Sequence, residues 1–123
     1  MAVIFTKAEA EQKAAEWQRV LRLQDWELAV NITRRDAMPL EGQGTCSWVL
    51  TRKEATICLL DPIDYPRDVI YEQDMEITLV HELLHLHLAA LTTTENEVAL
   101  EQAVGAISKA LVALARGAAC KEQ

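Results

Sequence analysis

The 123-residue sequence predicts an α+β domain in which one helix comes first, a sheet of about three strands follows, and two helices come last. Two observations predict this order. Apolar residues recur with helical spacing near the start of the chain and again beyond residue 75. Between residues 26 and 61, apolar and polar residues alternate as they do in half-buried strands. A chain of this length has room for one hydrophobic core, so we expect residues 1–123 to form a single domain.

The first helix is predicted to begin at Lys7 and to end near Leu23 or Gln24. Thr6 and Glu9 have the spacing of a capping box, in which each side chain accepts a hydrogen bond from the other residue's backbone N–H. Helical periodicity then defines the face that should be buried. That face consists of Ala10, Ala14, Trp17 and Leu21.

Three strands are predicted in the middle of the chain. The alternation of the first strand places Trp26, Leu28, Val30 and Ile32 on one face. Residues 45–51 and 55–61 alternate in the same way on either side of a charged turn, so they predict a β-hairpin. Matching their apolar faces pairs Leu50 with Ala55, Trp48 with Ile57, and Cys46 with Leu59. Residues 35–44, which contain one proline and two glycines, form an irregular loop that could lie over a site or simply connect two strands, and the plain connector is favoured.

Two helices are predicted after the sheet, and the short turn between them should make them an antiparallel hairpin. The longest apolar run, residues 77–91, lies in the first of these helices, which Asp74 or a neighbour should cap and which should end where the run ends. Thr94 and Glu97 have capping-box spacing, so the last helix should start there. Gly117 should end it.

Composition and charge limit the range of partners. A net charge of −7 would repel a phosphate backbone, and the sequence has no basic cluster, so we expect no nucleic-acid partner. The apolar run 77–91 is too short and too polar to span a membrane, so no membrane partner is expected.

The first five residues are apolar but too few for a secretory signal, which favours a cytoplasmic location. Cys46, Cys58 and Cys120 are widely spaced, which indicates reduced thiols and not a disulfide framework.

The most informative motif is His-Glu-Leu-Leu-His at residues 81–85. Four residues make little more than one helical turn, so His81 and His85 project from the same face and can reach one ion. Two neutral imidazoles bind zinc in this H-E-x-x-H arrangement, and Glu82 can act as the general base on a metal-bound water. Buried polar groups in so apolar a helix need partners, which a metal would provide. The motif therefore predicts a zinc site more strongly than a set of hydrogen-bonded core residues.

A catalytic zinc takes three protein ligands, so the motif needs one more. Leu88 and Leu91 stand where the spacing H-E-x-x-H-x-x-G-x-x-H requires glycine and histidine, and no aspartate occurs later in the chain. The remaining candidates are Glu95, Glu97 and Glu101. If the histidine helix reaches Leu91, His85 lies about 9 Å from its end, and Glu101 lies at a similar depth in the next helix. Glu97 is the alternative if the histidine helix ends a turn early.

These residues resemble those of the minimal gluzincin metallopeptidases and of small phage-type and prophage-type zincin proteins. The resemblance is specific only at residues 77–107, where residues 80–86 and 101–104 carry it, and the order of the predicted elements is similar along most of the chain. It implies a zincin-like fold and a zinc-dependent peptidase that hydrolyses a peptide or protein substrate. The stretch from Asn96 also matches the gluzincin pattern N-E-x-x-x-E, which implies Glu97 as the ligand and Glu101 as a partner of a ligand histidine.

One feature of that family has no clear counterpart in the sequence. Gluzincin peptidases use a further tyrosine or histidine to stabilise the oxyanion, but His87 lies about 200° around the helix from His85 and points away. Tyr65 and Tyr71, before the helix, are the only tyrosines, and either could be a core or surface aromatic instead. A binding or regulatory protein of the same fold, with a structural zinc or a catalytically weak site, is therefore the alternative function. Glu82 opposes that alternative, because a structural zinc needs no general base.

Overall fold

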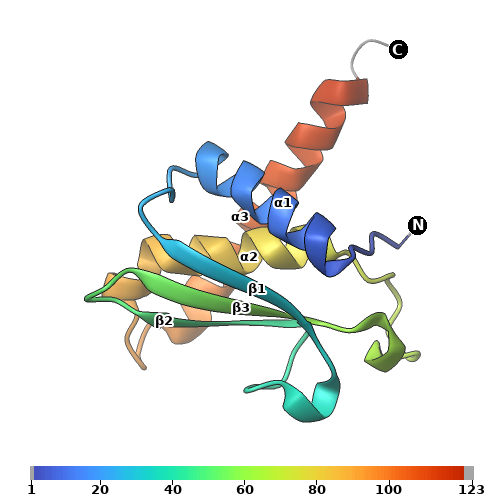
Figure 1. The fold of residues 1–123 in the computed structure, drawn as a ribbon, viewed down its shortest axis with the longest axis horizontal. Coiled ribbons are helices and arrows are strands. Elements are labelled where there is room, and N and C mark those ends of the chain that lie inside the picture. Colours follow the sequence, from blue (N-terminus) through green and yellow to red (C-terminus); the bar gives the residue numbers. More distant parts are fainter. Residues whose placement is uncertain (1, 121–123) are drawn as a thin grey trace.

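The computed structural model describes the backbone of residues 2–120 and the side chains of residues 2–117, and it has the predicted α+β architecture (Figure 1). The helices are α1 (Lys7–Val20), α2 (Met75–Leu88) and α3 (Glu97–Cys120). The strands are β1 (Glu27–Thr33), β2 (Gly44–Val49) and β3 (Glu54–Leu60). Short 3-10 turns lie at Arg35–Ala37, Pro62–Asp64 and Ala89–Leu91. The predicted order of one helix, a three-stranded sheet and two helices is confirmed.

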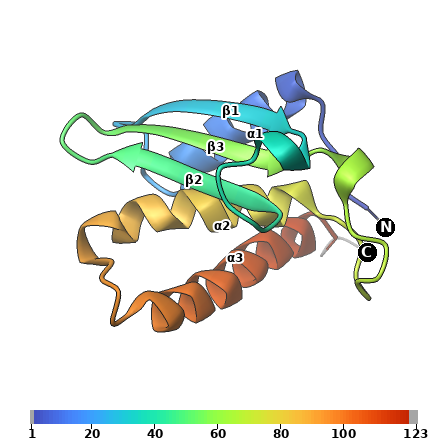
Figure 2. The same ribbon diagram turned by 90° about the horizontal axis from the view of Figure 1, so that it is seen from below.

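The three strands form a mixed sheet with the order β1-β3-β2. β1 runs parallel to β3, whereas β2 runs antiparallel to it. α1 and α2 cover one face of the sheet, and α3 packs on the side of α2 that faces away from the sheet (Figure 2). α2 therefore lies between the sheet and α3, which explains why its sequence is apolar nearly all round.

The hydrophobic core lies between the sheet, α1 and α2. On the predicted face of the first helix, Ala10, Ala14 and Trp17 are buried and Leu21 is partly buried. On the predicted face of the first strand, Trp26 and Val30 are buried, while Leu28 and Ile32 are partly buried and pack against the core. Periodicity thus identifies the inward faces of both elements correctly.

The register of the β-hairpin differs from the prediction by two residues. The observed partners are Trp48 with Ala55, Cys46 with Ile57, and Gly44 with Leu59. Residues 50–53 form the turn, and Lys53 closes it with a φ of 51°. A shift of two residues leaves every side chain on the same face of the sheet, so matching apolar faces cannot detect it.

Two of the three cysteines can be placed. Cys46 and Cys58 are free thiols, as expected, and they lie on neighbouring strands. The side chain of Cys120 lies outside the described residues. Nothing in the described structure therefore resembles a disulfide framework.

Both predicted caps on α1 and α2 are confirmed. Thr6 Oγ1 accepts a hydrogen bond from the Glu9 N–H at 3.2 Å, and Glu9 Oε1 accepts one from the Thr6 N–H at 2.8 Å. The Asp74 side chain accepts hydrogen bonds from the N–H groups of Glu76 and Ile77. These caps fix the first turns of the two helices that cover the sheet.

Two helix ends differ from the prediction. α1 ends at Val20, before the expected end near Leu23 or Gln24, because Arg22 has a φ of 62° and takes the chain into a turn. α3 continues through Gly117. A glycine ends a helix when it adopts a positive φ, and Gly117 does not adopt one.

The connection between α2 and α3 is longer than predicted. α2 ends at Leu88 and continues into a 3-10 turn, and α3 begins only at Glu97. The expected capping box between Thr94 and Glu97 does not form. Instead, the Thr93 N–H donates to Asn96 Oδ1 at 2.8 Å and the Asn96 N–H donates to Thr93 Oγ1 at 3.3 Å. Thr93 and Asn96 thus exchange side-chain-to-backbone hydrogen bonds as in a capping box, one residue before the pair that the sequence predicted.

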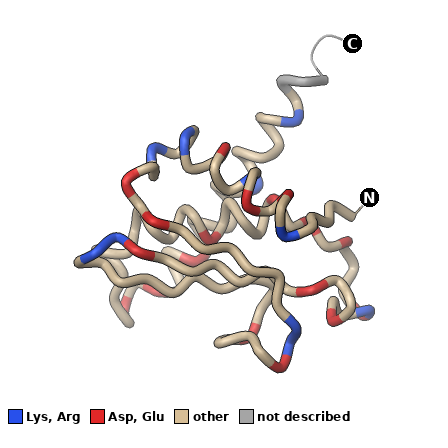
Figure 3. The backbone as a smooth tube through the Cα atoms, in the orientation of Figure 1, with Lys and Arg blue, Asp and Glu red and all other residues tan. Residues whose placement is uncertain are grey.

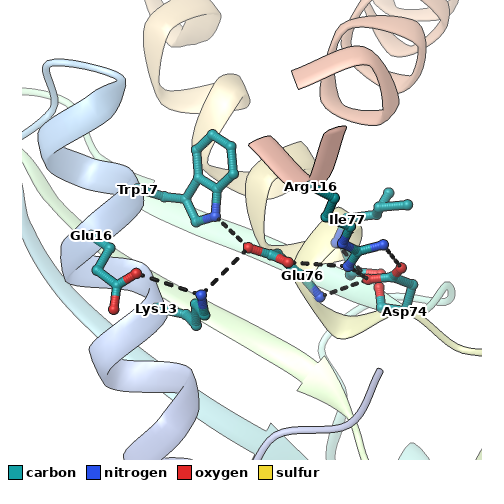
Figure 4. Close-up of polar contacts among 8 residues, drawn as sticks. Lys13, Glu16, Trp17, Asp74, Glu76, Ile77 and Arg116 are labelled. Carbon is teal, nitrogen blue, oxygen red and sulfur yellow. Dashed lines mark hydrogen bonds and ion pairs between the residues drawn. The ribbon is translucent and has the colours of Figure 1, made fainter. Parts of the chain in front are cut away.

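Ion pairs hold the far end of α3 against the start of α2 (Figure 4). Arg116 donates to Asp74 Oδ2 at 2.8 Å and to Glu76 Oε1 at 3.0 Å. Trp17 Nε1 donates to the other Glu76 oxygen at 2.9 Å. Glu76 therefore connects all three helices at one point.

α3 has one property that the sequence reading missed. The stretch Glu97–Gly117 is long and apolar enough to cross a membrane, judged by length and composition. Only 17% of this stretch is buried inside the domain. The expectation that no segment spans a membrane considered only the run 77–91. The exposed apolar surface of this helix therefore needs a physical explanation.

Candidate metal centre

α2 presents His81 and His85 on one face, one turn apart. The centres of their rings lie 5.1 Å from each other. Both side chains are mostly covered, with exposed fractions of 21% for His81 and 17% for His85. Helical periodicity alone produces this pair, because residues i and i+4 lie one above the other.

α3 brings Glu101 to the two histidines. Glu101 Oε1 lies 2.6 Å from His81 Nε2, and Glu101 Oε2 lies 3.1 Å from His85 Nε2. One ligand atom from each of the three residues lies within 4.8 Å of the other two, and no other group of this kind occurs among the described residues. The three side chains therefore form a site that could hold a metal ion.

The position of Glu101 follows from two differences between the predicted and the observed helix ends. These two differences offset each other. The histidine helix ends earlier than assumed, at Leu88, which would have favoured Glu97. The next helix also begins later, with Glu97 as its first residue, so its first turns are displaced along the hairpin. Glu97 is exposed and is not part of the metal-binding group, and the same is true of Glu95.

The three donors fit a zinc ion. Two imidazole nitrogens and one carboxylate oxygen are typical ligands of catalytic zinc. Zinc bonds of about 2.0 Å in a tetrahedron place the ligand atoms about 3.3 Å apart, so Glu101 would withdraw from His81 by less than about 1 Å. The Glu101 side chain is 57% exposed, so it has room for this adjustment.

Glu82 lies beside this group in a different environment. The residue is 7% exposed and lines the same cleft as His81 and Glu101. No described residue donates a hydrogen bond to its carboxylate. A buried carboxyl without such donors is uncommon in proteins and is a mark of functional sites.

Gly44 makes this position of Glu82 sterically possible. A Cβ added at Gly44, at the start of β2, would lie 2.4 Å from Thr78 Cγ2 and 3.4 Å from Glu82 Oε2. The absence of a side chain therefore lets β2 approach α2 and cover the Glu82 carboxyl. The sequence reading treated Gly44 as a loop residue, and only its position at the edge of an alternating segment could have indicated this contact.

Burial controls the proton affinity of the groups around the site. Burial and, secondly, the negative charge of Glu101 raise the pKa of Glu82 to about 8. Burial raises the pKa of the Cys46 thiol to about 12, and the charge of Glu82 acts in the same direction. Burial lowers the pKa of His85, although the charge of Glu101 opposes this effect. His85 is therefore held in the neutral form that binds metals.

The site lies at one end of a cleft of about 710 Å³. His81 lines the cleft, which extends to Ile77 and Thr78 nearer the N-terminal end of α2. α3 contributes Lys109, and residues 41–44, the last of which is the first residue of β2, contribute a further part of the lining. The interpretation of residues 35–44 as a plain connector is therefore wrong for the last four of them.

The structure also shows where the candidates for oxyanion stabilisation lie, which are the two tyrosines and the third histidine. Tyr71 lines the cleft and is 62% exposed. The Tyr65 hydroxyl donates to the carbonyl oxygen of Tyr71 at 2.9 Å, so Tyr65 supports the segment that carries Tyr71. His87 points away from the site, as expected, and its Nε2 lies 2.6 Å from the carbonyl oxygen of Leu21.

Comparisons with protein-family models, with curated proteins and with solved structures gave no match. The interpretation of this site therefore depends on its own geometry and chemistry.

The contact between β2 and α2 predicts a rescue experiment. Gly44→Ala should lower the free energy of unfolding by about 1–3 kcal/mol, because the new methyl group overlaps Thr78 Cγ2. Thr78→Ser removes that methyl group and keeps the hydroxyl bond to the Asp74 carbonyl, so it should restore most of the loss in the double variant. Urea unfolding measures both effects. Equal destabilisation by Gly44→Ala in both backgrounds would contradict the contact.

The raised pKa of Glu82 predicts how stability depends on pH in the metal-free protein. The folded pKa of about 8 exceeds the ordinary value of 4.5, so the folded state binds this proton more tightly than the unfolded state. The resulting stabilisation is complete below pH 4.5 and is lost as pH rises through 8. Between about pH 5 and pH 9, in a chelator, the wild type should lose at least about 1.4 kcal/mol more than Glu82→Gln does. Parallel pH profiles for the two proteins would contradict this assignment.

Proposed function

We propose that this protein is a zinc-dependent metallopeptidase of the zincin type. His81, His85 and Glu101 would hold the zinc, and Glu82 would act as the general base. The observation that carries the proposal is the position of Glu82. Glu82 is 7% exposed, lines the cleft, and lies beside the group of three candidate ligands.

Each group of the site has a defined role in this proposal. Zinc, when bound, supplies a Lewis acid that polarises a carbonyl group and lowers the pKa of water. Its positive charge would also lower the pKa of the Glu82 carboxyl, which must be ionised to act as a base. Glu82 accepts the proton that water loses as it attacks the carbonyl carbon, and it returns that proton to the leaving amine.

An extended peptide is the proposed substrate, bound by addition to β2. Within the described residues, β2 pairs only with β3, so its other edge offers free N–H and C=O groups. β2 begins at Gly44, which contacts Glu82, so a peptide on this edge would pass over the proposed base. Tyr71 lines the same cleft and is the proposed candidate for oxyanion stabilisation.

The alternative is a binding or regulatory protein with a structural zinc. Structural zinc sites are closed and take four protein ligands. Here the metal-binding group has three members, and Glu101 is 57% exposed in an open cleft. These features favour a site that leaves one position for water or substrate, so the peptidase remains the better supported function.

The ligand assignment is tested by metal content. Protein purified without a metal-affinity tag should contain about one zinc per chain by mass spectrometry, and a chelator should lower its melting temperature. Glu101→Ala should weaken zinc binding by at least about 10-fold, because it removes one of three ligands. Glu97→Ala should leave zinc affinity nearly unchanged, and Cys46→Ser should leave the metal content unchanged. Zinc loss from Glu97→Ala with retention in Glu101→Ala would reverse the assignment.

The role of Glu82 is tested by an isosteric change. Glu82→Gln should keep the zinc and the fold but reduce cleavage of an unfolded protein substrate by at least about 100-fold, because an amide cannot accept the proton. Undiminished cleavage by this variant would remove Glu82 from its role. A zinc-loaded wild type that cleaves neither itself nor unfolded protein would favour the structural-zinc alternative.

A further inference from the structure

The apolar packing of α3 does not by itself fix how far this helix lies along α2. In the described chain, α2 is the only element with which α3 makes extensive contact, and the fully buried residues of α3 are Val104, Ser108 and Val112. They recur every four residues and none is long, so a shift of α3 by about 6 Å would bring each close to the position of the next. The Ser108 hydroxyl donates to the carbonyl oxygen of Gly105 in the same helix and so does not oppose such a shift.

Charged side chains at two levels of α3 make its polar contacts with the rest of the molecule. Within the described residues, the side-chain hydrogen bonds and ion pairs from α3 to other elements come from Glu101 and Arg116. Lys109 and Arg116 are the only charged residues of α3 after Glu101 (Figure 3). Arg116 is therefore the one residue beyond the candidate metal site whose polar contacts can specify the level of α3.

The contacts of Arg116 have the geometry that this role requires. Its guanidinium donates to both oxygens of Asp74, at 2.8 and 3.1 Å, and to Glu76 Oε1 at 3.0 Å. The side chains of Asp74 and Glu76 are 19% and 12% exposed, so solvent screens these contacts less than it screens contacts on the open surface. A planar guanidinium that binds three oxygens in this way cannot keep them through a shift of about 6 Å.

A shift of four residues would exchange the carboxylate that faces the two histidines. Glu97 precedes Glu101 by four residues, so both project from the same side of α3, one turn apart. If α3 moved by one turn toward its C-terminal end, Glu97 would reach the present level of Glu101, and Leu100 would enter the buried row. Val112 would then take the place of Arg116, and a valine forms no ion pair.

The connection between the two helices is long enough for this shift. α2 ends at Leu88 and α3 begins at Glu97, so residues 89–96 join them. Eight residues can span more than about 25 Å when extended, whereas the shift adds about 6 Å. The chain between the helices therefore does not prevent the alternative position.

We propose that Arg116 sets the register of α3 on α2 and thereby determines that Glu101, and not Glu97, faces His81 and His85. Arg116 does not line the metal cleft, so it is a positioning residue that acts through the start of α2. The consequence for zinc binding rests on the proposed function. The register itself is a property of the metal-free fold and is measured separately.

Zinc affinity in combined variants tests the selection of Glu101. In the wild-type background, Glu101→Ala should weaken zinc binding by at least about 10-fold. In the Arg116→Ala background both registers should be populated, so Glu97 can replace the missing carboxylate, and the same change should cost less than about 3-fold. Adding Glu97→Ala should restore the full loss. A merely structural role of Arg116 would not reduce the effect of Glu101→Ala.

Arg34→Ala is the matched control for this comparison. Arg34 also donates two hydrogen bonds to one carboxylate, that of Asp64, at 2.7 and 3.3 Å, and neither residue belongs to α3. In the Arg34→Ala background, Glu101→Ala should therefore keep its full effect on zinc affinity. Full dependence on Glu101 in the Arg116→Ala background as well would overturn the proposal.

A distance in the metal-free protein separates this proposal from the proposed function. The turn between β2 and β3, which carries Arg52, and the C-terminal part of α3 lie at opposite ends of the molecule (Figure 2). With the three native cysteines replaced by serine, spin labels can be attached through Arg52→Cys and Leu114→Cys, because Leu114 is 69% exposed. Double electron-electron resonance on the Arg116→Ala protein should show a second distance, longer by up to about 6 Å, which the Arg34→Ala protein lacks.

The two measurements fail in different ways. A single, unchanged distance in the Arg116→Ala protein would overturn the role of Arg116, even if the wild type binds zinc through Glu101. A wild type that binds no zinc would overturn the proposed function, and the second distance would then still support the role of Arg116 in setting the register.

Discussion

The candidate site depends on the antiparallel packing of α3 against α2. His81 and Glu101 are separated by 20 residues, yet their side chains lie 2.6 Å apart. The buried side of α3 fixes its rotation, and the ion pairs of Arg116 with the start of α2 fix its level along that helix. One helix therefore supplies a carboxylate to the candidate site and an anchor to the fold.

A second constraint acts from the sheet. β2 approaches α2 so closely at Gly44 that a methyl group there would overlap Thr78. This approach covers Glu82, and burial then raises its pKa to about 8. With this pKa, the Glu82 carboxyl is mostly protonated at neutral pH and is therefore a poor base. A neighbouring divalent cation would favour its ionised form. If the site holds zinc as proposed, the geometry would couple the ionisation of Glu82 to metal binding.

The sequence predicts those features that depend on local periodicity. The pairing of His81 with His85 follows from helical spacing, and the inward faces of the first helix and strand follow from their patterns. The strand order β1-β3-β2 was not predictable, because alternation shows which face is buried but not which strand lies alongside. Glu101 lies beside the two histidines, as expected, although the end of α2 and the start of α3 differ from the prediction. The contact of Gly44 with Thr78 joins residues distant in sequence, and no local pattern indicates it.

The central claim is that two imidazoles and one carboxylate hold a zinc ion in an open site. X-ray absorption at the zinc edge, on protein loaded with one equivalent of zinc, tests it most directly. The account predicts only nitrogen and oxygen neighbours at about 2.0–2.2 Å, with an imidazole signal that corresponds to two histidines. Sulfur neighbours at about 2.3 Å, or the signal of fewer than two histidines, would contradict it.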